Sequence, residues 1–291
     1  MGMARHHIFR DEAQKTIATT MDKLSGRYSR WEIWQDFIMM SAISLANAVE
    51  SPHRGKREQM YLDRAKKYSK EELDSLASMM GAVVMGMEAN PEQDMLGELY
   101  MNLSLGNDAA GQFFTPYHIS HFMAEVTADD SLKARIKQKG WISVCDPCCG
   151  GGSLLVAFAN VCRRKGINFQ TSVLFAAQDI DPTVAMMCYI QLSLMGCAGF
   201  VKVGNSLTDP ITSFDDRALL PVESENIWFT PMYYRDVWQW RRIWAWMDLT
   251  ITLKAAPQTG LVSQAEPLPV LTIAPADEKL IEGQGGQLKL F

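Results

Sequence analysis

The sequence contains no long hydrophobic run, because no stretch of about 18 residues is both apolar and free of charge. We therefore expect no membrane-spanning helix. The first residues, MGMARHHIFRDEAQK, also lack the apolar core of a secretory signal. We expect a cytoplasmic protein, in which the six cysteines stay reduced.

Separated cysteine pairs are missing as well. Cys145, Cys148 and Cys149 are spaced C-x-x-C-C, with only His118 and His121 near them in the sequence. A structural zinc site usually takes four ligands from two separated pairs. The spacing therefore predicts no metal site and favours small residues in a tight turn.

Positive charge is not in excess, since the net charge is -5. This argues against a generally basic surface for nucleic acid and leaves a local basic patch possible. The 291 residues, 47% hydrophobic and 21% charged, are typical of a soluble globular protein with two domains or one domain and an appendage.

What the sequence does contain is the stretch VCDPCCGGGSLL. The run Trp141–Cys145 predicts a buried strand, and Ser153–Gly166 predicts a helix with Ser153 as its N-cap. Between them, glycines allow a sharp turn and close approach of a ligand to the helix N-terminus. Neither G-x-G-x-x-G nor a P-loop is present. The order is that of a cofactor-binding corner in an open α/β sheet.

Two later strands end in polar residues. Asp179 follows the apolar run SVLFAAQ, and Asn205 follows the strand predicted in FVKVGNSL. An acidic residue at the end of a second strand can bind ribose hydroxyls. Each of these residues could instead be a simple turn former, but their spacing relative to Asp146 and Gly150 favours one shared site.

Four segments together resemble a known family. GQFFTP (111–116), DPCCGGG (146–152), AQDIDP (177–182) and GNSL (204–207) are similar to motifs of the modification subunits of type I restriction-modification systems. The resemblance covers roughly residues 90 to 235. It implies an open Rossmann-like sheet and a DNA adenine-N6 methyltransferase that uses S-adenosylmethionine.

The resemblance also implies roles for particular residues. Phe114, Thr115 and Pro116 would lie over the methionine end of the cofactor. Asp146 and the loop Gly150, Gly151 and Gly152 would lie under it. Asp179 would hold the ribose hydroxyls, and Asn205 would contact the adenine ring or its amino group.

This sequence departs from the family at the catalytic motif. Members carry Asn-Pro-Pro-Tyr or -Phe, in which two acceptors take the hydrogens of the adenine amine and the ring stacks on the flipped base. None of the 12 prolines is adjacent to another. Thr230-Pro231-Met232-Tyr233, after a strand predicted at Asn226–Phe229, is the best positional match, and a simple turn is the alternative.

Three regions are expected along the chain: a helical domain at 1–105, a methyltransferase-like α/β domain at 106–250 and a loosely ordered tail at 251–291. The patterns predict helices at Ser29–Val49, Ser69–Met87, Pro91–Leu105 and Tyr233–Leu249. The last is rich in tryptophan and arginine. It could stack on bases, or it could pack against the sheet.

Two classes of function stay open: an active adenine-N6 methyltransferase with a diverged motif, and an inactive relative that binds the cofactor, DNA or a partner. DNA and a specificity subunit are the partners that the resemblance implies. The C-terminal residues Gln287–Phe291 resemble the pentapeptide with which bacterial proteins bind the β sliding clamp.

Overall fold

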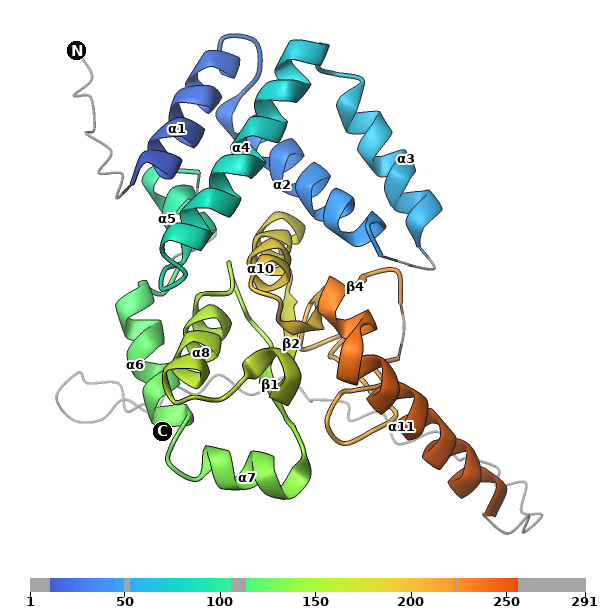
Figure 1. Ribbon diagram of the computed structural model, residues 1–291. Helices are drawn as coiled ribbons and strands as arrows, with labels where there is room; N and C mark the ends of the chain where they lie inside the picture. The colour runs from blue at the N-terminus through green and yellow to red at the C-terminus, as the bar shows by residue number, and fades with distance from the viewer. Residues whose placement is uncertain (1–10, 50–52, 106–113, 223, 256–291) are drawn as a thin grey trace, which may run out of the picture. The chain divides into compact units, whose positions relative to one another are not determined.

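The computed structural model describes residues 11–49, 53–105, 114–222 and 224–255 (Figure 1). The chain divides into two compact units, Met1–Thr250 and Ile251–Phe291, and the sheet lies in the first. No helix in the described ranges is long and apolar enough to cross a bilayer. The boundary that we predict between residues 105 and 106 stays a prediction.

Helices make up the described part of the chain before residue 105. They are α1 (Glu12–Leu24), α2 (Arg30–Asn47), α3 (Arg54–Ala65), α4 (Lys70–Ala89) and α5 (Met95–Asn102). Side-chain caps explain where several begin, since Asp11 caps α1 and Ser29 caps α2. Ser69 and Glu72 form the capping box predicted for α4.

Helix α2 is buried around much of its circumference. It contacts α3 on one side and α10, a helix that covers the sheet, on the other (Figure 1). Trp34, Phe37 and Ile38 are almost fully removed from solvent. The prediction of a buried helix is confirmed, and α2 connects the helical region to the sheet.

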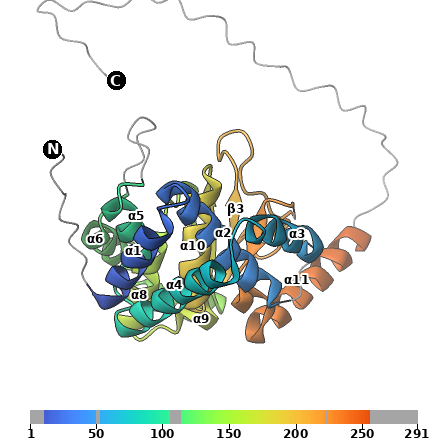
Figure 2. The ribbon, with the colours of Figure 1, turned by 90° about the horizontal axis from the view of Figure 1, so that it is seen from above.

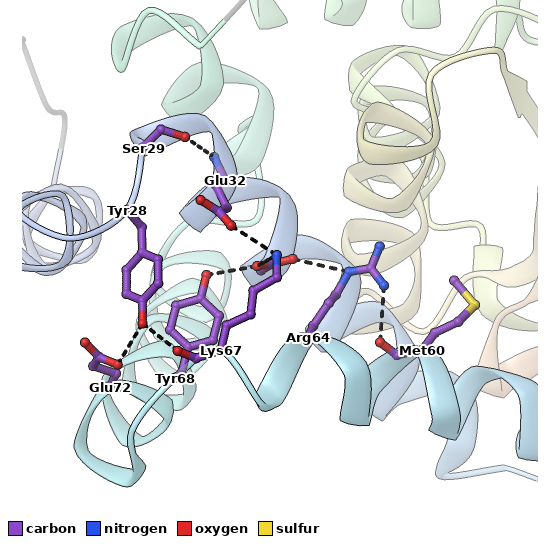
Figure 3. Close-up of polar contacts among 9 residues, drawn as sticks. Tyr28, Ser29, Glu32, Met60, Arg64, Lys67, Tyr68 and Glu72 are labelled. Atoms are coloured by element: carbon purple, nitrogen blue, oxygen red, sulfur yellow. Dashed lines mark hydrogen bonds and ion pairs between the residues drawn. The ribbon is translucent and has the colours of Figure 1, made fainter.

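A buried carboxylate joins α2 to α3 and to the residues just after it. Asp36 accepts hydrogen bonds from Lys67 Nζ and Tyr68 Oη, both at 3.0 Å, and Arg64 Nε lies 3.3 Å away. Figure 3 shows these three side chains converging on α2. The carboxylate raises the pKa of Lys67, and burial together with its charge raises the pKa of Tyr68. A buried charge is tolerated here because it is paired.

The α/β part carries a four-stranded sheet in the order β1-β2-β3-β4. Its strands are β1 (Ile142–Asp146), β2 (Val173–Asp179), β3 (Ala198–Val203) and β4 (Ile227–Phe229). The first three are parallel. The helices around them are α6 (Tyr117–Thr127), α7 (Leu132–Lys139), α8 (Ser153–Arg164), α9 (Phe169–Ser172), α10 (Pro182–Leu194), the 3₁₀ helix η2 (Pro231–Tyr234) and α11 (Asp236–Ala255). The predicted α/β fold with a helical N-terminal region is confirmed.

Alternate residues of β2 enter two cores. Phe175 and Ala177 belong to the core shared with α8, α10 and the N-terminal helices. Leu174 and Ala176 belong to a second core on the other face, where Trp238 of α11 is fully buried. Helices α6 and α11 lie on opposite sides of α10 in both views (Figure 1, Figure 2). The sheet is covered on both faces, as a parallel sheet requires.

Strand β4 runs in the opposite direction to its neighbour. It pairs antiparallel with β3, so that Phe229 lies beside Phe200 and Ile227 lies beside Lys202. The connection from β3 to β4 contains no helix in its described residues, so the chain turns back at the carboxyl edge of the sheet and runs toward the amino edge. The strand predicted at 226–229 is confirmed, and its direction determines where the next residues lie.

Three predicted helix boundaries are corrected. Pro91 is not a first helical residue, because α5 begins at Met95 and Asp94 is its N-cap. Ser153 is not the N-cap of α8; Gly152 takes that position, and the Ser153 hydroxyl instead donates to Ser120 Oγ at 2.9 Å. The helix predicted from Tyr233 begins at Asp236, after a short 3₁₀ turn.

Candidate functional site: a cofactor cleft at the carboxyl edge of the sheet

The glycine loop connects β1 to α8 in a conformation that needs glycine. Gly150 and Gly152 have positive φ angles of 54° and 96°. A Cβ on Gly152 would lie 2.8 Å from Cys188 Sγ. Cys149 N–H donates to Gln178 O at 2.9 Å, which ties the loop to β2. The sequence therefore builds a tight turn that places the N-terminus of α8 at the carboxyl edge of the sheet.

Two carboxylates flank this loop. Asp146 Oδ1 accepts from Cys148 N–H at 3.1 Å, and Asp179 Oδ2 accepts from Gly150 N–H at 2.9 Å. Burial raises the pKa of Asp146, and the nearby charge of Asp179 raises it further, although the Cys148 hydrogen bond opposes this. Asp179 thus contacts the loop directly while standing at the end of β2.

Asn205 follows β3 at the same edge. Its Oδ1 accepts from Leu207 N–H at 2.9 Å, and the neighbouring Ser206 Oγ lies 3.8 Å from Cys148 Sγ. Gln178 holds this segment by donating to Gly204 O at 3.1 Å. The structure therefore brings Asn205 to the loop, together with Asp146, Gly150, Gly151, Gly152 and Asp179.

Phe114, Thr115 and Pro116 line a cavity of about 410 Å³ beside the same loop. The Phe114 ring stacks on Tyr100 with centroids 5.1 Å apart, and it would lie 3.5 Å from a Cβ on Gly150. The preceding residues Gly111–Phe113 lie outside the described ranges. All the predicted cofactor-binding residues thus meet in one region of the molecule.

A buried polar cluster beside the loop was not predicted. Gln191 of α10 donates to Asp94 Oδ1 and to Gly151 O, both at 2.8 Å, and its Oε1 accepts from Leu96 N–H at 3.3 Å. Asp94 also accepts from Gly97 N–H. The sequence signal for this cluster is the single glutamine, Gln191, within the apolar run AMMCYIQLSL, because a buried amide needs hydrogen-bond partners.

The two cysteines of the loop, Cys148 and Cys149, are turn and packing residues. Cys149 is buried, and its pKa is raised by a hydrogen bond with Cys188 and by burial. Cys145 and Cys148 are exposed thiols. Among the described residues, no group of three or more His, Cys, Asp or Glu side chains is arranged to hold a metal ion.

Thr230, Pro231 and Tyr233 lie at the other edge of the sheet. Thr230 is fully buried, donates to Cys197 O at 2.7 Å and accepts from Gly199 N–H at 3.0 Å. Gly199 is near the amino end of β3, roughly 13 Å along the strand from Val203 at the cofactor edge. Because β4 runs antiparallel, the segment lies at the amino edge, away from Asp146 and Asp179, and its catalytic role stays a prediction.

Tyr233 also makes its contacts inside the protein. Its hydroxyl donates to Leu219 O at 2.7 Å, and its ring stacks on Phe229 with centroids 4.6 Å apart. The ring is buried in the second core, and its stacking on a flipped base stays a prediction. These contacts explain a role for Tyr233 in packing.

The fold and the site define an α/β protein whose glycine loop and strand-end acids lie at the carboxyl edge of its parallel strands, where such folds bind ligands. The sequence model of the N-6 DNA methylase family matches residues 92–242, which is more than half of the chain. The chain belongs to this family, which confirms the resemblance seen in its motifs and supports S-adenosylmethionine as its cofactor.

Two individual proteins are also similar. The type I restriction enzyme MjaIX methylase subunit of Methanocaldococcus jannaschii is 23% identical over 198 residues, which span 62% of this chain and 32% of that protein. A Listeria monocytogenes structure described as a class I S-adenosylmethionine-dependent methyltransferase has a TM-score of 0.36 and 15% identity, over 75% of this chain and 67% of that one. The chain thus covers about a third of the length of its methylase relative.

The residues present fit S-adenosylmethionine. Gly150 and Gly152 have positive φ angles, and Gly152 packs too closely on Cys188 for a side chain, so glycine keeps the turn tight beside Phe114. Asp179 offers carboxylate oxygens suited to hydroxyl groups, and the cavity beside Phe114 has both apolar and charged walls. When bound, the cofactor would supply an electrophilic methyl group on a sulfonium.

Proposed function

We propose that this chain binds S-adenosylmethionine for the N6-methylation of adenine in DNA. One observation carries the proposal: Asp146, the glycine loop, Asp179 and Asn205 gather at one sheet edge, beside the cavity lined by Phe114–Pro116. Residues separated by about 90 positions in the sequence meet there. A simple set of turn formers would not require that convergence.

Each element has a distinct task in this proposal. Asp179 accepts hydrogen bonds from the ribose hydroxyls, and Asn205 contacts the adenine. Ile180 and Leu207, which are exposed by 67% and 90%, supply apolar surface at the same edge. Phe114–Pro116 cover the methionine end, so that water is kept from the reactive methyl group.

A second candidate is a cofactor-binding module that does not transfer the methyl group by itself. The observation that favours it is the burial of Thr230 at the amino edge of the sheet. Transfer requires acceptors for the adenine amine near the methyl donor, and an error of 1 Å can lower the rate about 100-fold. In this case the acceptors would come from another segment or subunit.

DNA and a specificity subunit are the proposed partners. The relative from Methanocaldococcus jannaschii is itself called a subunit. The arginines of α11 offer little support for direct phosphate contacts, because Arg241 donates to Thr171 O at 2.6 Å and Arg242 lies over the Tyr233 ring at 4.5 Å. The packing role for this helix is therefore favoured, although Trp240 and Trp244 remain exposed.

Calorimetry with S-adenosylmethionine, run beside a methyl-transfer assay on DNA, tests both candidates. Binding with N6-methyladenine formation supports the active enzyme. Binding without transfer supports the module. No binding at millimolar cofactor contradicts both, provided that circular dichroism shows a folded chain.

A further inference from the structure

Asp94 is a buried carboxylate in the wall of the cavity lined by Phe114–Pro116. Only 2% of the residue is exposed, yet it lines the cavity of about 410 Å³ together with Phe114, Thr115 and Pro116. A Cβ on Gly151 would lie 3.7 Å from Asp94 Oδ1. The carboxylate therefore stands between the glycine loop and the segment expected over the methionine end of the cofactor.

Asp94 Oδ2 accepts neither of the hydrogen bonds made by Asp94, and it lies against Gly97, which also lines the cavity. Gly97 N–H and Gln191 Nε2 both donate to Oδ1, at 3.0 Å and 2.8 Å. Both donors are neutral, and in the part of the chain that the structure describes no Lys or Arg side chain forms an ion pair with this carboxylate. A buried carboxylate without a cation is costly, so the site is suited to a positively charged ligand.

We propose that Asp94 binds the positively charged methionine end of S-adenosylmethionine. The inference rests on the proposed function, and it assigns the electrostatic partner of the cofactor in this chain. S-adenosylmethionine carries two positive groups at that end, an ammonium and a sulfonium. A carboxylate already held in place gains a charge-assisted contact without having to be ordered on binding.

Gln191 is the positioning residue for this carboxylate. Its amide donates to Asp94 Oδ1 and to Gly151 O, so one side chain sets the distance between the carboxylate and the glycine loop. Leu96 N–H donates to its Oε1 at 3.3 Å, which orients the amide. The three elements that meet at Gln191 are α5, the loop before α8, and α10.

Glu98 is the other acidic residue in the cavity wall and provides a matched control. It is half-buried, whereas Asp94 is buried, so water screens its charge more strongly. Glu98→Gln removes one negative charge from the same cavity, as Asp94→Asn does. A general effect of cavity charge would therefore appear equally in both variants.

Asp94→Asn is the decisive variant because it preserves shape. Asparagine Oδ1 can still accept from Gly97 and Gln191, and Nδ2 replaces only the oxygen that makes neither bond. Calorimetry on the full chain compares S-adenosylmethionine, S-adenosylhomocysteine, which lacks the sulfonium, and 5′-methylthioadenosine, which lacks both charges. Thermal unfolding confirms that the variant is folded.

We expect Asp94→Asn to weaken S-adenosylmethionine binding at least about tenfold, while 5′-methylthioadenosine binding stays unchanged. An equal loss with S-adenosylhomocysteine identifies the ammonium, and a loss confined to S-adenosylmethionine identifies the sulfonium. If Asp94→Asn weakens the binding of all three ligands equally, or if Glu98→Gln has the same effect as Asp94→Asn, the proposed role of Asp94 is overturned and the proposed function is not. If the wild type binds none of them, the proposed function itself fails.

Discussion

The side-chain amide of Gln191 donates a hydrogen bond to the main-chain oxygen of Gly151 at 2.8 Å, in a fully buried setting. This contact links the last turn of α10 to the loop at the N-terminus of α8. The loop conformation thus depends on a residue 40 positions later in the sequence. Substitutions in α10 should therefore act on the cofactor site.

Gln191→Leu should destabilise the chain and weaken cofactor binding together. The change leaves Gly151 O and Leu96 N–H without this partner in a buried place, which costs about 2 kcal/mol or more in the free energy of unfolding. Urea unfolding and calorimetry measure the two effects. Gln239→Leu, at an exposed position on α11, is the control and should change neither.

Gly151 should tolerate alanine and reject valine. A Cβ there would meet Gly97 Cα and Met187 Cε at ordinary contact distances of 3.5 Å, but the further methyl groups of valine have no space. We expect Gly151→Val to abolish S-adenosylmethionine binding while helix content is retained. Equal affinity in wild type and Gly151→Val would contradict the placement of the cofactor.

Gly152→Ala should be more damaging to stability than Gly151→Ala. Its φ of 96° is unfavourable for alanine, and the new methyl would lie 2.8 Å from Cys188 Sγ. The two effects together should lower the free energy of unfolding by about 2 to 4 kcal/mol. Chemical denaturation of the two single variants measures the difference, and similar stabilities would show that the loop relaxes.

Restoring a family-like motif at Thr230 should not create activity. Thr230→Asn with Met232→Pro would place a larger side chain where Thr230 Oγ1 now bonds Cys197 and Gly199, at the edge away from the cofactor. We expect lower thermal stability and no gain in N6-methyladenine, measured by mass spectrometry of methylated DNA. A clear gain would show that this segment reaches the cofactor edge after all.

The stability of the cofactor-free chain should depend on pH through Asp94. Burial raises the pKa of Asp94 above its ordinary value of 3.8, so the folded state binds this proton more tightly than the unfolded state. The free energy of unfolding should then fall as pH rises from 3.8 through the raised pKa. Asparagine does not titrate, so the Asp94→Asn variant lacks this fall. The free energy of unfolding of the variant minus that of the wild type should therefore increase as pH rises through this range.

The comparison with Asp94→Asn isolates the effect of one group. Glu98, Tyr117 and His118 also line the cavity and are present in both proteins. Their contributions cancel when the two unfolding curves are subtracted at each pH. A difference that stays constant with pH would contradict the raised pKa.

The C-terminal residues Gln287–Phe291 lie outside the described ranges, and their similarity to a clamp-binding peptide stays a prediction. A fluorescent peptide of residues 283–291 should bind bacterial β clamp with micromolar affinity, because a short unstructured segment loses entropy on docking. Replacement of Leu290 and Phe291 by alanine should abolish that binding. No binding at high micromolar clamp would refute the idea.

Much of the cofactor site follows from local sequence. The strand before Asp146, the glycines after it and the acid at Asp179 are each adjacent in the chain to the element that positions them. Parallel strands joined by helical crossovers bring their carboxyl ends to one edge, so the convergence of these residues could be predicted. The capping box at Ser69 is local in the same sense.

The direction of β4 and the partners of Asp94 were decided only by the tertiary structure. The pattern of Ile227–Phe229 is the same whether the strand runs parallel or antiparallel, and packing on both faces of the sheet selects one direction. That choice places Thr230 at the amino edge. Asp94 and Gln191 are 97 residues apart, and only the packing of α5 on α10 makes them neighbours. Sequence spacing carries no information on such contacts, because burial and hydrogen-bond partners arise when separate elements pack together.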